Sequence, residues 1–247
     1  MTSPARSVGL TSNAMVQLTL NLHCGTAFGR SDFLISDSNA AAMAWIERWP
    51  DWPASPLVMH GPPGCGKTHL AHLWSKRASA VLLTGAALDE EEAAQLVARH
   101  SCRVVIDDAD EAPELALLHT YNWCWECQGS LLIIGRRPPA RWRIALDDLS
   151  SRLRAAHIVE IGRPDDALLA GVLVKHFADR QLSVSPGVIS FLIRRIERSF
   201  ACAADIAARL DAAALREKSP VTIALARTVL AQNGYWPDEG SDGDARS

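Results

Sequence analysis

The sequence has no surplus of positive charge and very little lysine. Lysine and arginine together number 25 against 28 aspartates and glutamates, which gives a formal net charge of −3. A protein that binds nucleic acid over a broad surface more often carries a basic surplus or a basic stripe. The charge balance therefore gives no indication that this chain coats DNA or RNA.

Long apolar runs are also missing. No stretch approaches the roughly 20 unbroken apolar residues that a membrane-spanning helix needs, and the N-terminus lacks the basic and apolar regions of a secretory signal. Six cysteines in 247 residues are too few for a disulfide scaffold, so we expect a reducing cytoplasm. The length suits one large domain, or a core domain with a small second one.

Two groups of side chains could be metal or redox ligands. Cys124 and Cys127 could form a redox dithiol or half of a zinc site, but they lie in residues 114–128, which contain no glycine or proline. No second cysteine pair completes a zinc site, so thiols on a helix are the favoured interpretation. His69 and His72 are likewise interpreted as ordinary helix residues, because no third ligand suggests itself.

Strand-like and helix-like segments alternate through the first two thirds of the chain. This alternation predicts an α/β fold, with a parallel sheet flanked by helices on both faces. An earlier helix, with Ser38 as its N-cap, is expected over 39–49. The expected strands are 57–60, 80–84, 102–106, 130–134 and 157–161, and the expected helices between them are 67–78, 89–100, 113–128 and 147–154.

After Pro164 the pattern becomes purely helical, which predicts a small second domain. Its expected helices are 165–180, 186–199, 203–217 and 221–232. We therefore expect four regions, of which the last is acidic and rich in glycine and so predicted to be disordered. The regions are a flexible N-terminal segment (1–29), a nucleotide-binding domain (30–163), a helical domain (164–233) and a tail (234–247).

A complete P-loop motif, G-x-x-x-x-G-K-[ST], follows the first expected strand of the sheet. Its glycines let backbone N–H groups turn towards phosphate oxygens, its lysine places a positive charge on the terminal phosphates, and its threonine offers a hydroxyl to Mg²⁺. A chance glycine-rich turn is the alternative, which the strand before and the helix after disfavour. The motif consists of Gly61, Pro62, Pro63, Gly64, Cys65, Gly66, Lys67 and Thr68.

An acidic motif lies about forty residues downstream of Lys67. The apolar run 102–106 is followed by Asp107 and Asp108, where a parallel sheet places its ligand chemistry. Asp107 is predicted to hold Mg²⁺ and Asp108 to polarise an attacking water. Two solvated aspartates at a strand end are the alternative, but the P-loop upstream favours the functional interpretation.

These motifs resemble the AAA+ ATPases, and among them the DnaA branch. The resemblance covers roughly residues 30 to 232. It implies a helical lid after the P-loop domain, bound ATP or ADP with Mg²⁺, and a nucleotide site that includes Phe33, Asn39 and His69. The matching segments are Gly66–Leu70, Phe33–Ile35 with Ser38 and Asn39, Arg137–Pro139, and Ser151–Leu153.

Within this branch the chain is similar to the Hda regulators. DnaA continues into a helix-turn-helix domain, whereas this chain ends soon after the expected lid. Hda proteins pair with ATP-bound DnaA and trigger its ATP hydrolysis, in association with the DNA polymerase sliding clamp. The resemblance extends to a Gln-Leu-x-Leu-x-Leu clamp-binding motif, for which an ordinary edge strand is the alternative; its residues are Gln17, Leu18, Leu20 and Leu22.

By the same resemblance, Arg152 is the arginine finger that is offered to a neighbouring subunit. Its alternative is a surface arginine on a short helix. Two places depart from the branch: Gly135 and Arg136 stand where DnaA has a polar sensor I, and Ala201 stands at the sensor II arginine, with Arg198 nearby. Both departures put hydrolysis by the chain itself in doubt while leaving nucleotide binding intact.

The predicted function is therefore a nucleotide-binding regulator that binds the sliding clamp and promotes ATP hydrolysis by DnaA, which restrains replication initiation. Such a protein would contact DNA only indirectly and could form a homodimer. One alternative is an ATPase that turns over ATP itself, as a helicase loader does. A truncated DNA-binding initiator is a further alternative.

Overall fold

Five parallel strands form one sheet in the computed structural model, which describes residues 34–52, 56–91, 95 and 102–232. The order of the strands across the sheet is β2-β3-β4-β1-β5. All the paired strands run parallel, so the predicted parallel sheet is confirmed. The strands are β1 (Leu57–His60), β2 (Val81–Thr84), β3 (Arg103–Asp107), β4 (Ser130–Gly135) and β5 (His157–Glu160).

Helices cover both faces of this sheet. Alternate residues of one strand point to opposite faces, so Val104 and Ile106 pack with α4 and α5 while Val105 packs with α1 and α2. A sheet that is buried on both sides needs strands with apolar centres, as in β1, β3 and β4, whereas the edge strand β5 is largely exposed. The helices are α1 (Ala40–Arg48), α2 (Lys67–Ala78), α4 (Glu114–Glu126) and α5 (Asp147–Ala155).

Two details at the edges of the sheet differ from expectation or fall outside the described ranges. The predicted N-cap of α1 was wrong: the N-cap is Asn39, not Ser38. The Asn39 side chain bonds backward instead, accepting from the amide of Ser36 and donating to the carbonyl of Leu34. The expected helix 89–100 falls mostly on residues that the structure does not describe.

Short 3₁₀ turns follow three of the strands: η2 (Gly85–Ala87), η3 (Ala109–Glu111) and η4 (Pro139–Arg141).

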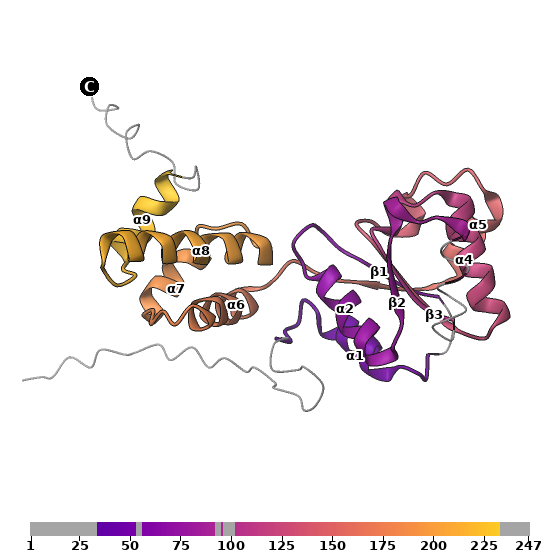
Figure 1. Cartoon of the computed structure of the whole chain (residues 1–247), viewed down its shortest axis with the longest axis horizontal. Coiled ribbons are helices and arrows are strands. Elements are labelled where there is room, and N and C mark those ends of the chain that lie inside the picture. Colours follow the sequence, from indigo (N-terminus) through magenta and orange to yellow (C-terminus); the bar gives the residue numbers. More distant parts are fainter. Residues whose placement is uncertain (1–33, 53–55, 92–94, 96–101, 233–247) are drawn as a thin grey trace, which may run out of the picture.

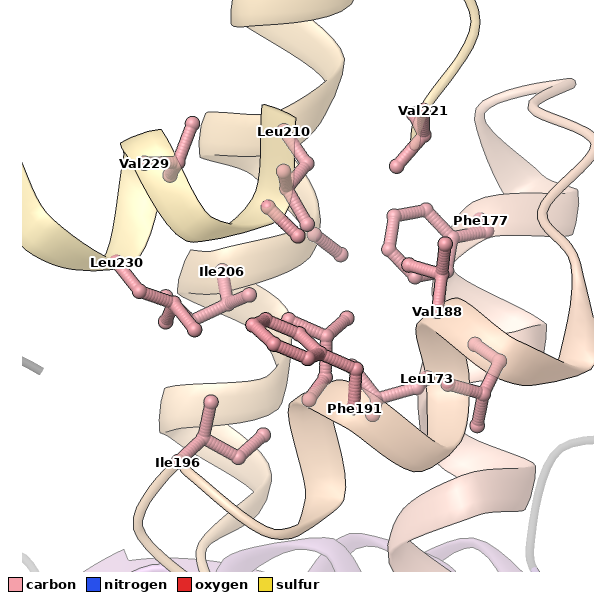
Figure 2. Close-up of a cluster of buried hydrophobic side chains, with 14 of the residues drawn as sticks. Leu173, Phe177, Val188, Phe191, Ile196, Ile206, Leu210, Val221, Val229 and Leu230 are labelled. Carbon is pink, nitrogen blue, oxygen red and sulfur yellow. The ribbon is translucent and has the colours of Figure 1, made fainter. Parts of the chain in front are cut away.

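The C-terminal part is a separate helical unit with its own apolar core. Figure 2 shows Phe177, Phe191 and Leu210 pointing into this core, which the helices bury from all sides. No helix in the described ranges is long and apolar enough to cross a lipid bilayer. The helices of this unit are α6 (Asp166–Asp179), α7 (Pro186–Ile193), α8 (Phe200–Glu217) and α9 (Ile223–Gln232).

Two helix boundaries in this unit were predicted wrongly. The helix expected to reach residue 199 ends at Ile193, and the helix expected to begin at residue 203 begins at Phe200. Ser199 is the N-cap of α8, because its hydroxyl accepts a hydrogen bond of 3.1 Å from the amide of Cys202. In Figure 1 the helical unit lies to one side of the sheet, and the segment between β5 and α6 joins the two. The predicted domain boundary at residues 163 and 164 falls in this segment.

Candidate nucleotide-binding site

The P-loop connects β1 to α2 and has the backbone geometry that phosphate binding needs. Gly64 and Gly66 have φ values of +73° and +97°, which residues with a side chain adopt only with strain. In this described segment no side chain caps the N-terminus of α2. The first amides of the helix therefore remain available to an anion, whose charge the helix dipole also favours.

The ammonium group of Lys67 is buried within the loop that it belongs to. Its Nζ donates to the carbonyl oxygens of Gly61 at 2.8 Å and Pro62 at 2.9 Å, and the residue is only 8% exposed. A buried cation needs such partners, and phosphate oxygens would supply stronger, charge-assisted ones. The Lys67 ammonium group is thus held within the P-loop, where the motif predicts the terminal phosphates to bind.

The remaining predicted P-loop residues divide into exposed and buried ones. Thr68 and His69 are exposed in the first turn of α2. Cys65 faces the other way, since its side chain packs in the core between the sheet and α1 and α2. Burial raises the pKa of its thiol, so this group stays protonated and Cys65 can offer a nucleotide only its backbone.

Strand β4 separates the P-loop from the acidic residues of β3. His60 at the end of β1 pairs with Gly135 of β4, and the amide of Gly61 donates to the Gly135 carbonyl at 3.3 Å. On its other side, β4 pairs with β3, which ends at Asp107. The segment after β4 therefore begins between the P-loop and the two aspartates.

Asp107 and Asp108 have different surroundings. Asp107 is 8% exposed, and its Oδ1 accepts from the Asp108 amide at 3.0 Å. Asp108 has a left-handed φ of +50°, and its Oδ1 lies 3.4 Å from Nε of Arg136. Arg136 also pairs with Glu111 at 2.9 Å, and its amide donates to Asp110. The second aspartate is therefore paired with Arg136, the arginine at the predicted sensor I position.

A magnesium ion would find only part of its ligands in the protein. The predicted donors are the Thr68 hydroxyl and the Asp107 carboxylate, which are the hard oxygen ligands that Mg²⁺ prefers. Within the described ranges no group of three or more His, Cys, Asp or Glu side chains could hold a metal. Mg²⁺ commonly takes one or two carboxylates and fills its other positions with phosphate oxygens and waters, so these donors suit an ion that arrives with a nucleotide.

The segment before α1 is bonded to the residues that follow β5, which in turn bond to the end of β1 before the P-loop. The Ser38 carbonyl accepts from the amide of Gly162 at 2.8 Å, and the amide of Ile161 donates to His60 at 2.7 Å. Asn39, predicted to lie near the base, is 2% exposed and uses its side chain to hold this segment. Phe33 and the clamp-motif residues Gln17, Leu18, Leu20 and Leu22 lie outside the described residues.

Helix α8 of the helical unit contacts the P-loop directly. The amide of Phe200 donates to the Gly64 carbonyl at 2.9 Å. A Cβ on Gly64 would lie 2.3 Å from Ser199 Cβ, and one on Gly66 would lie 2.7 Å from the Phe200 ring. The two glycines thus leave room for the helical unit as well as for phosphate. The sequence prediction missed this contact, although Ser199 is a typical N-cap residue that could have placed the start of α8 here.

The residues near the predicted sensor II position do not bring a cation to the P-loop in this structure. Ala201 is exposed, and the guanidinium of Arg198 pairs with Asp166 at the start of α6, at 2.7 Å. Arg198 therefore has an acidic partner within the helical unit.

Arg152, the predicted finger, lies on α5 and contacts α4. Its Nε donates to Asp148 Oδ1 at 2.7 Å, and its Cζ lies 5.1 Å from the centroid of the Tyr121 ring. The Asp148 carboxylate raises the pKa of this guanidinium above its usual value. About a third of the side chain, 34%, is exposed, so a partner could reach it from outside.

Of the two cysteines near the end of α4, one is a buried thiol and the other is exposed. Cys124 lies within α4 and is 2% exposed, while Cys127 is exposed after the helix end. Burial raises the pKa of Cys124 to about 12 and that of the neighbouring Cys102 to about 11. Thiols with such values are poor nucleophiles near neutral pH, which supports the interpretation of helix thiols over a redox dithiol.

Comparison with known proteins finds one family model and many relatives. The model described as "Hda, lid domain" matches residues 166–230. The chromosomal replication initiator proteins DnaA of Thermomicrobium roseum and Herpetosiphon aurantiacus are each 26% identical, over 79% and 81% of this chain. These matches cover 46% and 48% of the relatives, so the chain spans about half the length of the curated relatives it matches.

Solved structures share the fold at lower identity. Domain III of DnaA from Thermotoga maritima aligns with a TM-score of 0.68 and 16% identity, over 82% of this chain and 95% of that one. A DnaA bound to AMPPCP and single-stranded DNA gives 0.60 and 16%, over 76% and 67%. A RuvB mutant from Thermotoga maritima gives 0.66 and 14%, over 79% and 68%. These likenesses confirm the predicted fold, a parallel sheet flanked by helices and followed by a small helical domain.

Proposed function

We propose that the chain, which is similar to DnaA proteins and matches the Hda lid model over residues 166–230, is a nucleotide-bound AAA+ regulator of the DnaA/Hda type that promotes ATP hydrolysis by DnaA. In this proposal the protein also binds the polymerase sliding clamp. The ATP hydrolysis that it promotes in DnaA restrains replication initiation in the cytoplasm. The observation that carries the proposal is the ion pair between Arg136 and Asp108. Asp108 is the carboxylate that the chain would need in order to hydrolyse ATP itself, and this ion pair occupies it.

Nucleotide binding rests on the P-loop. Lys67, the left-handed glycines and the uncapped start of α2 together form a site for the phosphates of ATP or ADP. Thr68 and Asp107 would hold Mg²⁺, which supplies charge neutralisation on the phosphates when it is bound. Two of the DnaA structures with the same fold hold AMPPCP, a nucleotide analogue of the kind expected here.

Weak intrinsic hydrolysis follows from the surroundings of Asp108. A carboxylate polarises an attacking water by accepting its hydrogen bond. The Asp108 carboxylate instead has the Arg136 guanidinium beside it, with Nε 3.4 Å from Oδ1, so a cation occupies the position from which the acid would engage a water. Ala201 offers no charge at the sensor II position, and Arg198 is paired with Asp166. The site is thus better suited to holding a nucleotide than to cleaving it.

Arg152 is the residue through which the protein would act on DnaA. A guanidinium that enters a neighbour's nucleotide site stabilises the charge that develops on the transferred phosphoryl group, which for finger residues is worth roughly 10³- to 10⁵-fold in rate. The Arg152 side chain is partly exposed on α5. It contacts Asp148 and the Tyr121 ring but is not enclosed in the core. Its side chain can therefore leave Asp148 for a phosphate without disturbing the fold.

The clamp contact rests on the motif formed by Gln17, Leu18, Leu20 and Leu22, which precedes the described residues. An extended peptide of this kind can place its leucines in an apolar cleft while the glutamine amide bonds at a polar rim. Because the clamp encircles the DNA, the chain itself would contact DNA only indirectly. Self-association into a homodimer is compatible with this role.

The decisive experiment compares Arg152→Ala with Arg154→Ala, an exposed arginine on the same helix. Phosphate release by ATP-loaded DnaA is measured with clamp-loaded DNA and each variant. We expect the wild type and Arg154→Ala to accelerate hydrolysis, and Arg152→Ala to lose that acceleration while keeping its affinity for nucleotide and clamp. Equal acceleration by both variants would remove Arg152 from the mechanism.

A self-hydrolysing ATPase is the second candidate, since Asp107 and Asp108 provide the acids for it. Brisk turnover by the isolated chain, without DnaA or clamp, would establish this alternative and reject the regulator. Deletion of residues 17–22 tests the clamp contact separately, because unchanged retention on a clamp column would show that the motif has no such role.

A further inference from the structure

Among the described residues, a strongly exposed aromatic side chain of the sheet domain lies close to the predicted finger. Trp125 in the last turn of α4 is 63% exposed. Its ring stacks on the ring of Tyr121, one helical turn earlier, with the centroids 6.5 Å apart and the planes 12° from parallel. Tyr121 itself is buried, at 8% exposed, so it forms a fixed support for the tryptophan.

Tyr121 also contacts Arg152 on the neighbouring helix. The Arg152 guanidinium carbon lies 5.1 Å from the Tyr121 ring centroid, within the range of a cation–π contact. A buried tyrosine thus has the exposed indole of α4 beside it and the cation of α5 over it. We call the row formed by Trp125, Tyr121 and Arg152 the Trp125 surface.

The composition of the Trp125 surface is that of an interface centre. Tryptophan, tyrosine and arginine are the residue types most enriched among interface hot spots, and a buried aromatic side chain removes 150–250 Å² from water. A single exposed hydrophobic residue needs no explanation on its own. Here the exposed Trp125 ring contacts Tyr121, and Tyr121 contacts Arg152, the predicted finger. One partner could therefore cover both Trp125 and Arg152.

The pairing of a cation with an apolar ring selects among partners. The occupant has to place an anion at Arg152 and apolar protein surface over Trp125. Duplex DNA offers phosphates, but its bases are stacked inside, so it would leave the indole ring in water. A nucleotide held at the edge of a folded domain offers both, since its phosphates are surrounded by protein side chains.

We propose that the Trp125 surface docks on the nucleotide-holding face of an ATP-loaded DnaA-type subunit, with Trp125 as the apolar anchor and Tyr121 as the positioning residue for both neighbours. This inference rests on the proposed function and adds the contact that brings Arg152 to its target. Trp125 supplies affinity, whereas Arg152 supplies rate. The two contributions are separable by experiment.

The test uses the full chain with Trp125→Ala, and with Leu215→Ala as the matched control. Leu215 is 79% exposed on α8 of the lid. The variant Leu215→Ala therefore removes a similarly exposed apolar side chain at a position distant from Trp125 in the sequence. Binding to full-length DnaA loaded with AMPPCP is measured by sedimentation, and DnaA-dependent phosphate release is measured with ATP. Trp125→Phe retains the stacked ring and serves as the conservative variant.

We expect Trp125→Ala to weaken binding about tenfold or more and to raise the concentration for half-maximal stimulation by the same factor. Its maximal stimulated rate should equal that of the wild type. Leu215→Ala should leave both quantities unchanged, and Trp125→Phe should recover most of the affinity. Arg152→Ala should give the opposite pattern, a lost rate with binding largely kept.

Several outcomes would overturn the inference. If the wild type stimulates DnaA and both Trp125 variants behave as it does, the surface is wrong and the proposed function stands. If Trp125→Ala reduces self-association or binding to duplex DNA but not to DnaA, the occupant is a second copy of the chain or DNA. If the wild type neither binds nor stimulates DnaA, the proposed function and this inference fail together.

Discussion

The Nε atom of Arg136 lies 3.4 Å from Oδ1 of Asp108, across the ends of two neighbouring strands. Arg136 is about half exposed, at 49% of its side chain, so the pair adds little to the stability of the fold. Its importance is chemical, because it neutralises one of two acids beside the P-loop. Glu111 holds the same guanidinium at 2.9 Å, which fixes the arginine in this place.

Replacement of Arg136 should raise ATP hydrolysis by the isolated protein. In Arg136→Asn the side chain is polar, as at the sensor I position of DnaA, and Asp108 loses its cationic partner. We expect phosphate release to increase several-fold in a single-turnover assay. The adjacent exposed residue gives the control, since Arg137→Asn should leave the rate unchanged. A slower reaction in Arg136→Asn would mean that the arginine assists hydrolysis instead of restraining it.

Replacement of Lys67 should remove most of the nucleotide affinity. Its ammonium would exchange two carbonyl partners for phosphate oxygens, and a hydrogen bond to a charged group contributes enough that we expect a loss of roughly 10- to 100-fold in Lys67→Ala. Titration with a fluorescent ADP analogue measures this loss. Lys76→Ala, in the exposed last turn of α2, should bind ADP as the wild type does. Retained affinity in Lys67→Ala would contradict the proposed role of the P-loop.

His60 should make the stability of the fold depend on pH. Burial lowers the pKa of this side chain below its usual 6.5, assisted by the nearby charges of Arg141 and Lys67 and opposed by Glu160. The unfolded chain therefore binds a proton at a higher pH than the folded one does, so the free energy of unfolding should fall as the pH drops below about 6.5.

The variant His60→Gln isolates this contribution. Denaturant unfolding at pH 7 and pH 5 should show a smaller loss of stability in His60→Gln than in the wild type, whereas the exposed His72→Gln should behave as the wild type. An identical loss in all three proteins would assign the pH dependence to other groups. His176 in the lid, whose pKa burial also lowers, accounts for part of what remains.

The contact between α8 and the P-loop should transmit nucleotide binding to the lid. Phe200 is the first residue of α8, where proline is well tolerated. Phe200→Pro removes the amide that bonds to Gly64 together with the ring beside Gly66, whereas Phe200→Leu changes the ring alone. We expect ADP to raise the thermal stability of the lid in the wild type and in Phe200→Leu, but not in Phe200→Pro. Hydrogen exchange in α6 to α9 reports the lid separately. Equal protection of the lid in Phe200→Pro would show that another route connects it to the nucleotide.

Local patterns predicted the sheet domain well. The expected strand 57–60 and helix 67–78 agree with β1 and α2 at both ends, because the glycines of the P-loop separate them sharply. The lid was harder. Ile196 continues the helical spacing of Ile189 and Leu192, but it enters the core from a turn after α7 has ended. Periodicity records which residues are buried, and a turn can bury an apolar side chain as well as a helix does.

The candidate site was predictable only where it is local in sequence. The P-loop and the acids after β3 are contiguous motifs, so the sequence contains their signal. The pairing of Arg136 with Asp108 and Glu111 depends on the adjacency of β3 and β4, which no spacing reveals. The same holds for Arg152 and Tyr121, which meet because α4 and α5 pack side by side on one face of the sheet.

The bond from the Phe200 amide to the Gly64 carbonyl joins two main-chain atoms. Almost every substitution leaves such atoms in place, so an alanine scan of the lid would pass over this link and genetic screens would rarely recover its loss. For the same reason, side chains in the lid can change without breaking it. The connection between the P-loop and the lid is in this respect protected from ordinary mutation.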